Sequence, residues 1–345
     1  MKKNCLAGLM FVALALAHTP AQAILGVDDH VPGYDVLAPF FLVSIPDCGS
    51  LDTLIALTET GESSVRFRLT VFTPNAVLCL AKSIHLSKGD VLPISLSALL
   101  KSAPGQSLSS LEIDLDRDGV NDHYAGYVMF ENLNEKDPKN QAMGVLYLVN
   151  LVNGVSAGVN LASIEVDETL SITDLRLVDQ NRHTERFSGN AMYRAQQYIS
   201  LPFKPSTVKD ATYFRLLPRY VLIDSTYYNY WFVWSDSPVN SAVVLIYDED
   251  ENLISGTLPP LSKGLTIVDF KQIVPNVGSE STPVAGWIDL TLSDVDVQLL
   301  GYTFLFKFAS SNASNKTLFE TSVQNQTVSG FGVLSETHRD AGTVD

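Results

Sequence analysis

Residues able to bind a metal ion are concentrated in one short stretch of this 345-residue sequence. From position 114 to 122 the chain reads DLDRDGVND, with Asp at the first, third, fifth and ninth places and Gly at the sixth. Carboxylates at alternate positions can converge on one hard cation, and glycine permits the sharp turn that this requires. The carbonyl at the seventh place adds an oxygen. We therefore expect a calcium site formed by Asp114, Asp116, Asp118, Val120 and Asp122.

This pattern resembles the calcium loops of EF-hand, dockerin and thrombospondin type 3 proteins over residues 114–122 alone. The twelfth place, a bidentate Glu in an EF-hand, is Ala125 here, and apolar strand-like segments rather than helices flank the loop. Glu112 is a candidate for the missing carboxylate. We expect an affinity of roughly 10⁻⁴–10⁻³ M, as in extracellular modules. The alternative is a solvated acidic turn, because Asp and Gly favour turns in any protein.

A second candidate is the aromatic segment 227–234, which reads YYNYWFVW. On a strand, alternate residues share one face, so the segment has an aromatic row on each side. One of the two rows is a candidate to be exposed and to stack on sugar rings or on a partner. The candidate residues are Tyr228, Tyr230 and Trp234 on one face and Trp231 on the other. The alternative is that both rows form core and an interface between two domains.

The sequence predicts no catalytic residue. The histidines are scattered without H-E-x-x-H spacing, and neither a G-x-S-x-G elbow nor a phosphate-binding glycine loop occurs. A non-catalytic binding or structural role is therefore our first hypothesis. The alternative is a secreted hydrolase acting on polysaccharide, with carboxylates brought together in space beside the aromatic segment.

The first 23 residues have the pattern of a secretory signal peptide. Lys2 and Lys3 precede an apolar stretch, and an A-x-A motif ends at Ala23. We expect export to the periplasm or exterior of a bacterium, with an uncleaved anchor as the alternative. No later stretch has 18 uninterrupted apolar residues, so no membrane span is expected in the mature chain.

Charge and cysteine content narrow the partners and the compartment. The net charge of −15 disfavours nucleic acid and anionic lipid, and it suits cations, a glycan or another envelope protein better. Loss of the leader leaves two cysteines, Cys48 and Cys79. In an oxidising compartment an even count predicts one disulfide, and two unpaired thiols are the alternative.

Short runs of alternating apolar and polar residues, such as residues 65–71, dominate the sequence and predict half-buried strands. Further strands are expected at residues 36–45, 53–58, 77–86, 124–130 and 144–152. Helical spacing is confined to residues 191–198 and one turn at Leu96–Lys101. The chain is therefore expected to be all-β.

The second half of the chain repeats the first. Four short matches occur in the same order: residues 36–43 with 215–222, 86–89 with 261–264, 125–127 with 285–287, and 144–148 with 301–305. Collinear matches predict two tandem antiparallel, immunoglobulin-like β-sandwich repeats. The expected organisation is a signal peptide at 1–23, a first repeat at 24–165, a mixed connecting segment with a short helix at 166–211, a second repeat at 212–330 and a flexible tail at 331–345. The acidic loop is an insertion in the first repeat.

Overall fold

The computed structural model describes fifteen ranges of the chain: residues 32–45, 51–103, 108–134, 139–151, 156–166, 197–199, 214–216, 218–223, 227–239, 242–254, 257–274, 284–292, 299–308, 317–318 and 325–328. Within these ranges nearly all regular structure is antiparallel strand, so the all-β prediction is confirmed. The predicted signal peptide, Cys48 and the predicted tail at 331–345 lie outside the described residues.

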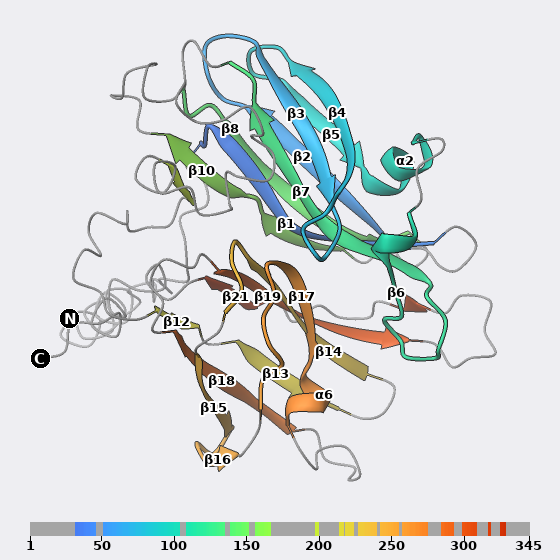
Figure 1. Ribbon diagram of the computed structural model, residues 1–345, viewed down its shortest axis with the longest axis vertical. Helices are drawn as coiled ribbons and strands as arrows, with labels where there is room; N and C mark the ends of the chain where they lie inside the picture. The colour runs from blue at the N-terminus through green and yellow to red at the C-terminus, as the bar shows by residue number, and fades with distance from the viewer. Residues whose placement is uncertain are drawn as a thin grey trace, which may run out of the picture.

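The first half of the molecule contributes two sheets (Figure 1). Sheet I has the strand order β5 (Val91–Ser95), β2 (Leu51–Glu59), β8 (Ala142–Asn150), β9 (Ser156–Asn160). Sheet II has the order β11 (Gln197–Ile199), β10 (Ala162–Val166), β1 (Asp35–Ser44), β7 (His123–Asn132), β3 (Val65–Phe72), β4 (Leu78–Leu86), and β6 (Glu112–Ile113) also pairs with β7.

The second half contributes two more sheets. Sheet III has the order β17 (Gly264–Asp269), β14 (Tyr227–Ser235), β19 (Leu299–Phe308), β20 (Thr317–Leu318), and β21 (Asn325–Val328) also pairs with β19. Sheet IV has the order β12 (Phe214–Leu216), β18 (Val284–Leu292), β15 (Ala242–Asp248), β16 (Leu253–Ile254), and β13 (Arg219–Leu222) also pairs with β18.

The two halves pair their strands in the same order. The order β1-β7-β3-β4 of sheet II corresponds to β12/β13-β18-β15-β16 of sheet IV, and sheet I corresponds to sheet III in the same way. The predicted immunoglobulin-like character of the sandwiches is not confirmed. In an immunoglobulin domain the first two strands are neighbours in one sheet, whereas here the first strand pairs with the seventh and the second with the eighth.

Two glycines show how closely the halves correspond. Gly126 in β7 lies against Phe72, and a Cβ at this position would be 2.2 Å from the Phe72 carbonyl oxygen. Gly286 in β18 lies in the same way against Tyr247, whose carbonyl oxygen would be 2.0 Å from such a Cβ. Both glycines belong to the sequence match of residues 125–127 (AGY) with residues 285–287 (AGW). Only a residue without a side chain permits this approach of one strand to the next.

The described helices are short: α2 (Leu96–Lys101), the 3-10 helix η1 (Ser109–Leu111) and α6 (Phe270–Ile273). The predicted turn at α2 is confirmed. Its N-cap is Ser95, and the equivalent N-cap of α6 is Asp269; each side chain accepts a backbone N–H of the first turn. The predicted helix at 191–198 is wrong at its described end, because Gln197 and Tyr198 belong to β11 and pair with β10.

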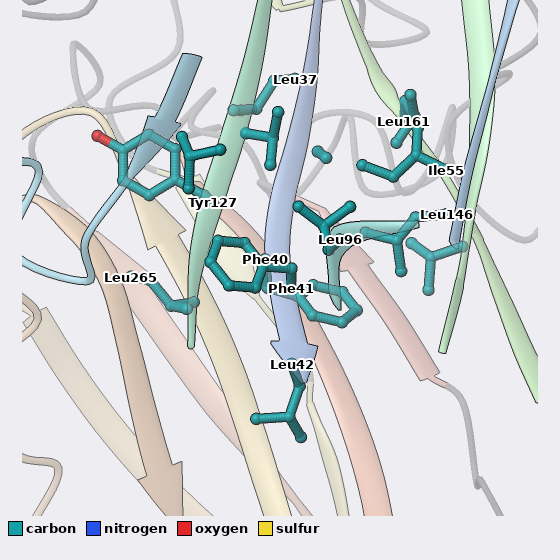
Figure 2. Close-up of a cluster of buried hydrophobic side chains, with 14 of the residues drawn as sticks. Leu37, Phe40, Phe41, Leu42, Ile55, Leu96, Tyr127, Leu146, Leu161 and Leu265 are labelled. Carbon is teal, nitrogen blue, oxygen red and sulfur yellow. The ribbon is translucent and has the colours of Figure 1, made fainter. Parts of the chain in front are cut away.

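The four sheets are stacked in the order I, II, III, IV. Strand β1 is buried along its whole length because it has a partner sheet on both faces. Phe41 points toward Leu96 and Leu146 of the sheet I side, whereas Phe40 points away from them (Figure 2). The ring of Phe40 lies 5.2 Å from that of Phe232 in sheet III. One core therefore extends through sheets I, II and III, and a second joins sheets III and IV.

Candidate metal centre

The predicted calcium loop connects β6 to β7, and its own carboxylates shape it. The Asp114 Oδ2 atom accepts the backbone N–H of Gly119 at 2.9 Å. Asp116 and Asp118 each accept the backbone N–H two residues further on, at 3.2 and 2.9 Å. Aspartate favours such local turns. Gly119 has a φ of 89° and Arg117 a φ of 60°, so the chain reverses direction through two left-handed residues.

Three of the five predicted ligands lie together. Carboxylate oxygens of Asp114, Asp116 and Asp118 are all within 4.8 Å of one another. Asp122 is not part of this group; it is buried, and its Oδ1 lies 2.5 Å from the Nδ1 of His123. Val120 is 50% exposed, and its backbone N–H donates to Asp118. The loop therefore brings together the first three alternate carboxylates.

Two oxygens near the cluster are buried without a hydrogen-bond partner among the described residues. They are Oδ1 of Asp114 and Oδ2 of Asp122. Burial of Asp116, together with the nearby charges of Asp122, Asp118 and Asp114, raises the pKa of the Asp116 carboxyl to about 6. Removal from water and repulsion between like charges both disfavour the ionised form. A cation among these oxygens would reverse both effects.

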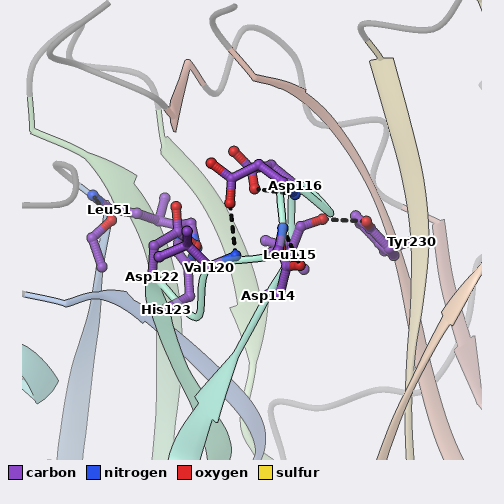
Figure 3. A network of polar contacts seen from close by, with 11 residues as sticks. Leu51, Asp114, Leu115, Asp116, Val120, Asp122, His123 and Tyr230 are labelled. Atoms are coloured by element: carbon purple, nitrogen blue, oxygen red, sulfur yellow. Dashed lines mark hydrogen bonds and ion pairs between the residues drawn. The ribbon is translucent and has the colours of Figure 1, made fainter. Parts of the chain in front are cut away.

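The loop also contacts the second half of the molecule. Leu115 is buried, and its carbonyl accepts the hydroxyl proton of Tyr230 in β14 (Figure 3). The Nη2 atom of Arg117 lies 2.7 Å from Oδ2 of Asp269, the N-cap of α6. Burial raises the pKa of Asp269, and the Arg117 charge opposes this rise. The acidic insertion of the first half thus lies on the boundary between the halves.

Sequence reasoning missed these contacts between Arg117 and Asp269 and between Leu115 and Tyr230. The partners are more than a hundred residues apart along the chain, and nothing in either segment marks the other. The apolar Leu115 within an acidic run was the one available signal, because an apolar residue at such a position indicates a buried side of the loop.

The stacking prediction is wrong for three of its four residues. All three are buried: Trp231 is 0% exposed, Trp234 1% and Tyr230 3%. The two rows do alternate as predicted, since Tyr230 and Trp234 face sheet II and Trp231 faces sheet IV. Both faces of β14 are covered because a sheet lies on each side. Tyr228 is half-buried, and the Nζ atom of Lys271 lies 4.5 Å from its ring centroid.

The predicted disulfide is not observed. Cys79 carries a free thiol in β4, and Cys48 lies outside the described residues. Cys79 is half-buried, and burial raises the pKa of its thiol. A raised pKa leaves less thiolate at neutral pH and lowers nucleophilicity.

A cavity of about 330 Å³ opens between β4, β5 and α2. Its lining is mainly apolar and comprises Leu69, Lys82, Ile84, Leu92, Pro93, Ile94, Ser95, Ala98, Leu99 and Ser102. Glycoside hydrolysis requires two carboxyl groups on either side of the scissile bond. This cavity has no carboxylate in its lining, so it does not offer that arrangement.

Comparison with known proteins leaves the family open. No family model and no curated protein matches this chain. One solved structure, "Crystal Structure of Thermotoga maritima 1070", is similar at 12% identity and a TM-score of 0.25, over 38% of this chain and 95% of that one. Within the part of the chain that the structure describes, no helix is long and apolar enough to cross a bilayer.

Proposed function

We propose that this chain is an exported, non-catalytic protein of a bacterial envelope or exterior, with a binding or structural role. We further propose that each half is one copy of a two-sheet sandwich and that the loop at residues 114–122 binds calcium. The shared strand order and the four collinear sequence matches support the repeat. The leader-like first 23 residues support export, either to the periplasm or beyond.

The convergence of three carboxylates beside buried, unpartnered oxygens carries the calcium proposal. Asp114, Asp116 and Asp118 would supply oxygens directly, and the Val120 carbonyl and Asp122 would complete the set. Calcium takes six to eight oxygen ligands in flexible geometry, so a loop built from carboxylates and a carbonyl suits it. Burial first, and then the charges of Asp122, Asp118 and Asp114, raise the pKa of Asp116, so the ionised cluster is disfavoured without a cation.

Calcium would also stabilise the contact between the halves. The loop that holds the carboxylates also places Leu115 against Tyr230 and Arg117 against Asp269. An ordered loop loses less conformational entropy when it makes these contacts. A structural role for the metal follows, with a glycan or another envelope protein as the partner class that the net charge favours.

The polysaccharide hydrolase is the weaker hypothesis. It depended on an exposed aromatic row and on a pair of carboxylates in a cleft. Tyr230, Trp231 and Trp234 are buried, and the cavity beside α2 has no carboxylate in its lining. The observations therefore favour the non-catalytic role.

Thermal unfolding of the protein with calcium and with chelator tests the proposal. At ~10 mM calcium and a dissociation constant of roughly 10⁻⁴–10⁻³ M, binding should add about 1.4–2.7 kcal/mol to the free energy of unfolding. The double variant Asp116→Ala, Asp118→Ala should show no such gain.

The matched control is Asp250→Ala in the acidic turn between β15 and β16, which lies outside the carboxylate cluster of residues 114–118. This variant should retain the full calcium response. A midpoint that calcium leaves unchanged at millimolar concentrations would contradict the metal site and leave an ordinary acidic turn.

A further inference from the structure

The internal interface joins two different faces of the repeat. Sheet I is equivalent to sheet III, and sheet II is equivalent to sheet IV. In the stack I, II, III, IV, the outer face of sheet II packs against the outer face of sheet III. The contact is therefore head-to-tail, and it leaves the outer face of sheet I at one end and the outer face of sheet IV at the other. These two faces are the equivalents of the two faces already joined inside the molecule.

The outer face of sheet I is mainly apolar in its middle, and the polar residues Asp52, Thr58 and Ser95 lie toward its ends. Alternation in β8 places Leu146 and Leu148 in the core and the residues between them on the outer side. The match of Gly144 with Gly301 aligns Val145 with Tyr302 and Tyr147 with Phe304. In sheet III these positions are buried against sheet II, whereas Tyr147 is 41% exposed. Other outward residues of sheet I are Leu54, Ala56, Val91, Pro93, Met143 and Val149.

The outer face of sheet IV carries a row of exposed aliphatic residues, with the carboxylate of Asp289 in β18 directly opposite Leu245. Val243, Leu245 and Leu253 are 61%, 36% and 62% exposed. Beside them the rings of Tyr247 and Trp287 are stacked, with centroids 5.3 Å apart. The equivalent pair on sheet II is Phe72 and Tyr127, stacked at 4.9 Å, and Trp234 of sheet III packs against that pair.

Two equivalent glycines differ in what lies next to them: Gly264 lies at the contact between the halves, and Gly89 lies at a position that no other described part of the chain covers. Gly264 begins β17 against the first half, where a Cβ would be 2.2 Å from the Pro74 carbonyl oxygen, and the next backbone N–H donates to this oxygen at 2.8 Å. Gly89 is its counterpart in the first half, with a φ of 73°, and nothing lies within 4 Å of the corresponding Cβ. Pro74 lies in the turn between β3 and β4, which corresponds to the turn between β15 and β16.

We propose that the outer face of sheet I binds the outer face of sheet IV of a second copy of this chain, so that molecules assemble head to tail. The proposal rests on the non-catalytic, structural role put forward above, and it does not involve the calcium loop. Heterologous contacts of this kind extend into open chains or rings. The outer face of sheet I carries mostly aliphatic residues beside Tyr147, whereas the equivalent face of sheet III carries aromatic rings, so the association is expected to be reversible and concentration-dependent.

Light scattering or sedimentation of the full chain over a concentration series reaching ~100 μM measures the association. The wild type should increase in mass with concentration. Tyr147→Glu on sheet I and Leu245→Glu on sheet IV should each remain monomeric, because each buries an unpaired charge in the contact. Val77→Glu is the control, since Val77 is 59% exposed in the turn before β4, away from both faces. The Tyr147→Glu and Val77→Glu variants should retain the wild-type unfolding midpoint, and Leu245→Glu should remain folded with a slightly lower midpoint, because its carboxylate lies opposite Asp289.

A mixture of the two variants distinguishes head-to-tail assembly from contact between two identical faces. The Tyr147→Glu variant keeps a wild-type sheet IV, and the Leu245→Glu variant keeps a wild-type sheet I, so an equimolar mixture should form a one-to-one dimer and nothing larger. If Leu245→Glu alone still dimerises, two sheet I faces bind each other and the proposal is overturned. A wild type that stays monomeric overturns it as well. The series is run in calcium and in chelator, so that loss of the calcium response alone leaves this inference intact.

Discussion

Sheets I and III have the same strand order but different surroundings. Outward positions of sheet III carry Tyr230, Phe232, Trp234, Tyr302, Phe304 and Phe306, all buried against sheet II. Equivalent positions of sheet I carry Leu54, Ala56, Thr58, Val145, Tyr147 and Val149, which are exposed or half-buried. Aromatic side chains each bury 150–250 Å² and dominate core and interface energetics. One scaffold therefore provides a permanently buried face and an accessible one, and the size of the outward side chains distinguishes them.

The largest expected difference is in the unfolding free energy that is lost when the ring is removed at two equivalent positions, Phe304 in sheet III and Tyr147 in sheet I. Phe304 is 0% exposed, and its ring lies 5.2 Å from that of Phe40 and 5.5 Å from that of Phe232. Phe304→Ala should cost about 3–5 kcal/mol of unfolding free energy, because it leaves a cavity in the interface. Tyr147→Ala should change the unfolding free energy by about 0.5 kcal/mol or less.

Urea unfolding of both variants at a concentration where the protein is monomeric measures this difference. The two variants remove similar rings from equivalent strands, so each serves as the control of the other. Equal losses would mean that the outer face of sheet I is covered within one molecule, and the comparison between the sheets would then be wrong.

Gly264 and Gly89, the two equivalent glycines, provide a second comparison between a buried and an exposed position. Alanine in the left-handed region costs roughly 1–2 kcal/mol at either position. Gly264→Ala should lose about 1–3 kcal/mol more than Gly89→Ala, because its Cβ meets the Pro74 carbonyl. The excess loss, measured by urea unfolding, reports the contact between the halves. A loss at Gly89 as large as that at Gly264 would show that φ alone governs both sites.

Local patterns predicted much of this fold. Period-two alternation located β1, β2, β3, β4, β7 and β8 to within one or two residues and missed β5, β9 and β10. The match of residues 125–127 with 285–287 marked equivalent places in β7 and β18. Alternation also assigned Trp231 and Tyr230 to opposite faces of β14. Sequence could not show that both faces are covered, because burial of β14 depends on sheet II, which lies far away along the chain. The contact of Arg117 with Asp269 was hidden for the same reason.

The order of strands was also beyond local reasoning. Short alternating strands fit many sandwich topologies, and the immunoglobulin label came from their number and length alone. The acidic loop was more accessible, because its carboxylates and glycine are close in sequence and act locally. Its ninth residue, Asp122, was predicted as a ligand by spacing, yet the start of β7 places it beside His123. The spacing of the loop therefore predicted the three clustered carboxylates, but it could not predict that Asp122, next to β7, lies outside their group.

The smallest expected effect compares the acidic turns of the two halves. Burial and neighbouring carboxylates raise the pKa of Asp116 to about 6, whereas hydrogen bonds from Asn252 lower the pKa of Asp248. An acid with a raised pKa favours folding when it is protonated. In chelator, the stability due to Asp116 should be complete below the unfolded pKa of about 3.9 and should be lost as the pH rises through about 6.

Asp248 should act with the opposite sign, because its stabilisation is present above the ordinary aspartate pKa and is lost as the pH falls. Unfolding midpoints between about pH 2.5 and 7 therefore separate the two turns, with the Asp248 effect at the acidic end and the Asp116 effect toward neutral pH. In chelator, Asp116→Asn should remove a decline toward neutral pH, and Asp248→Asn should remove a rise. Calcium should reverse the Asp116 contribution, because the ion binds the deprotonated carboxylate. A decline that persists unchanged in Asp116→Asn would assign it to another group and contradict a cluster of repelling carboxylates in this loop.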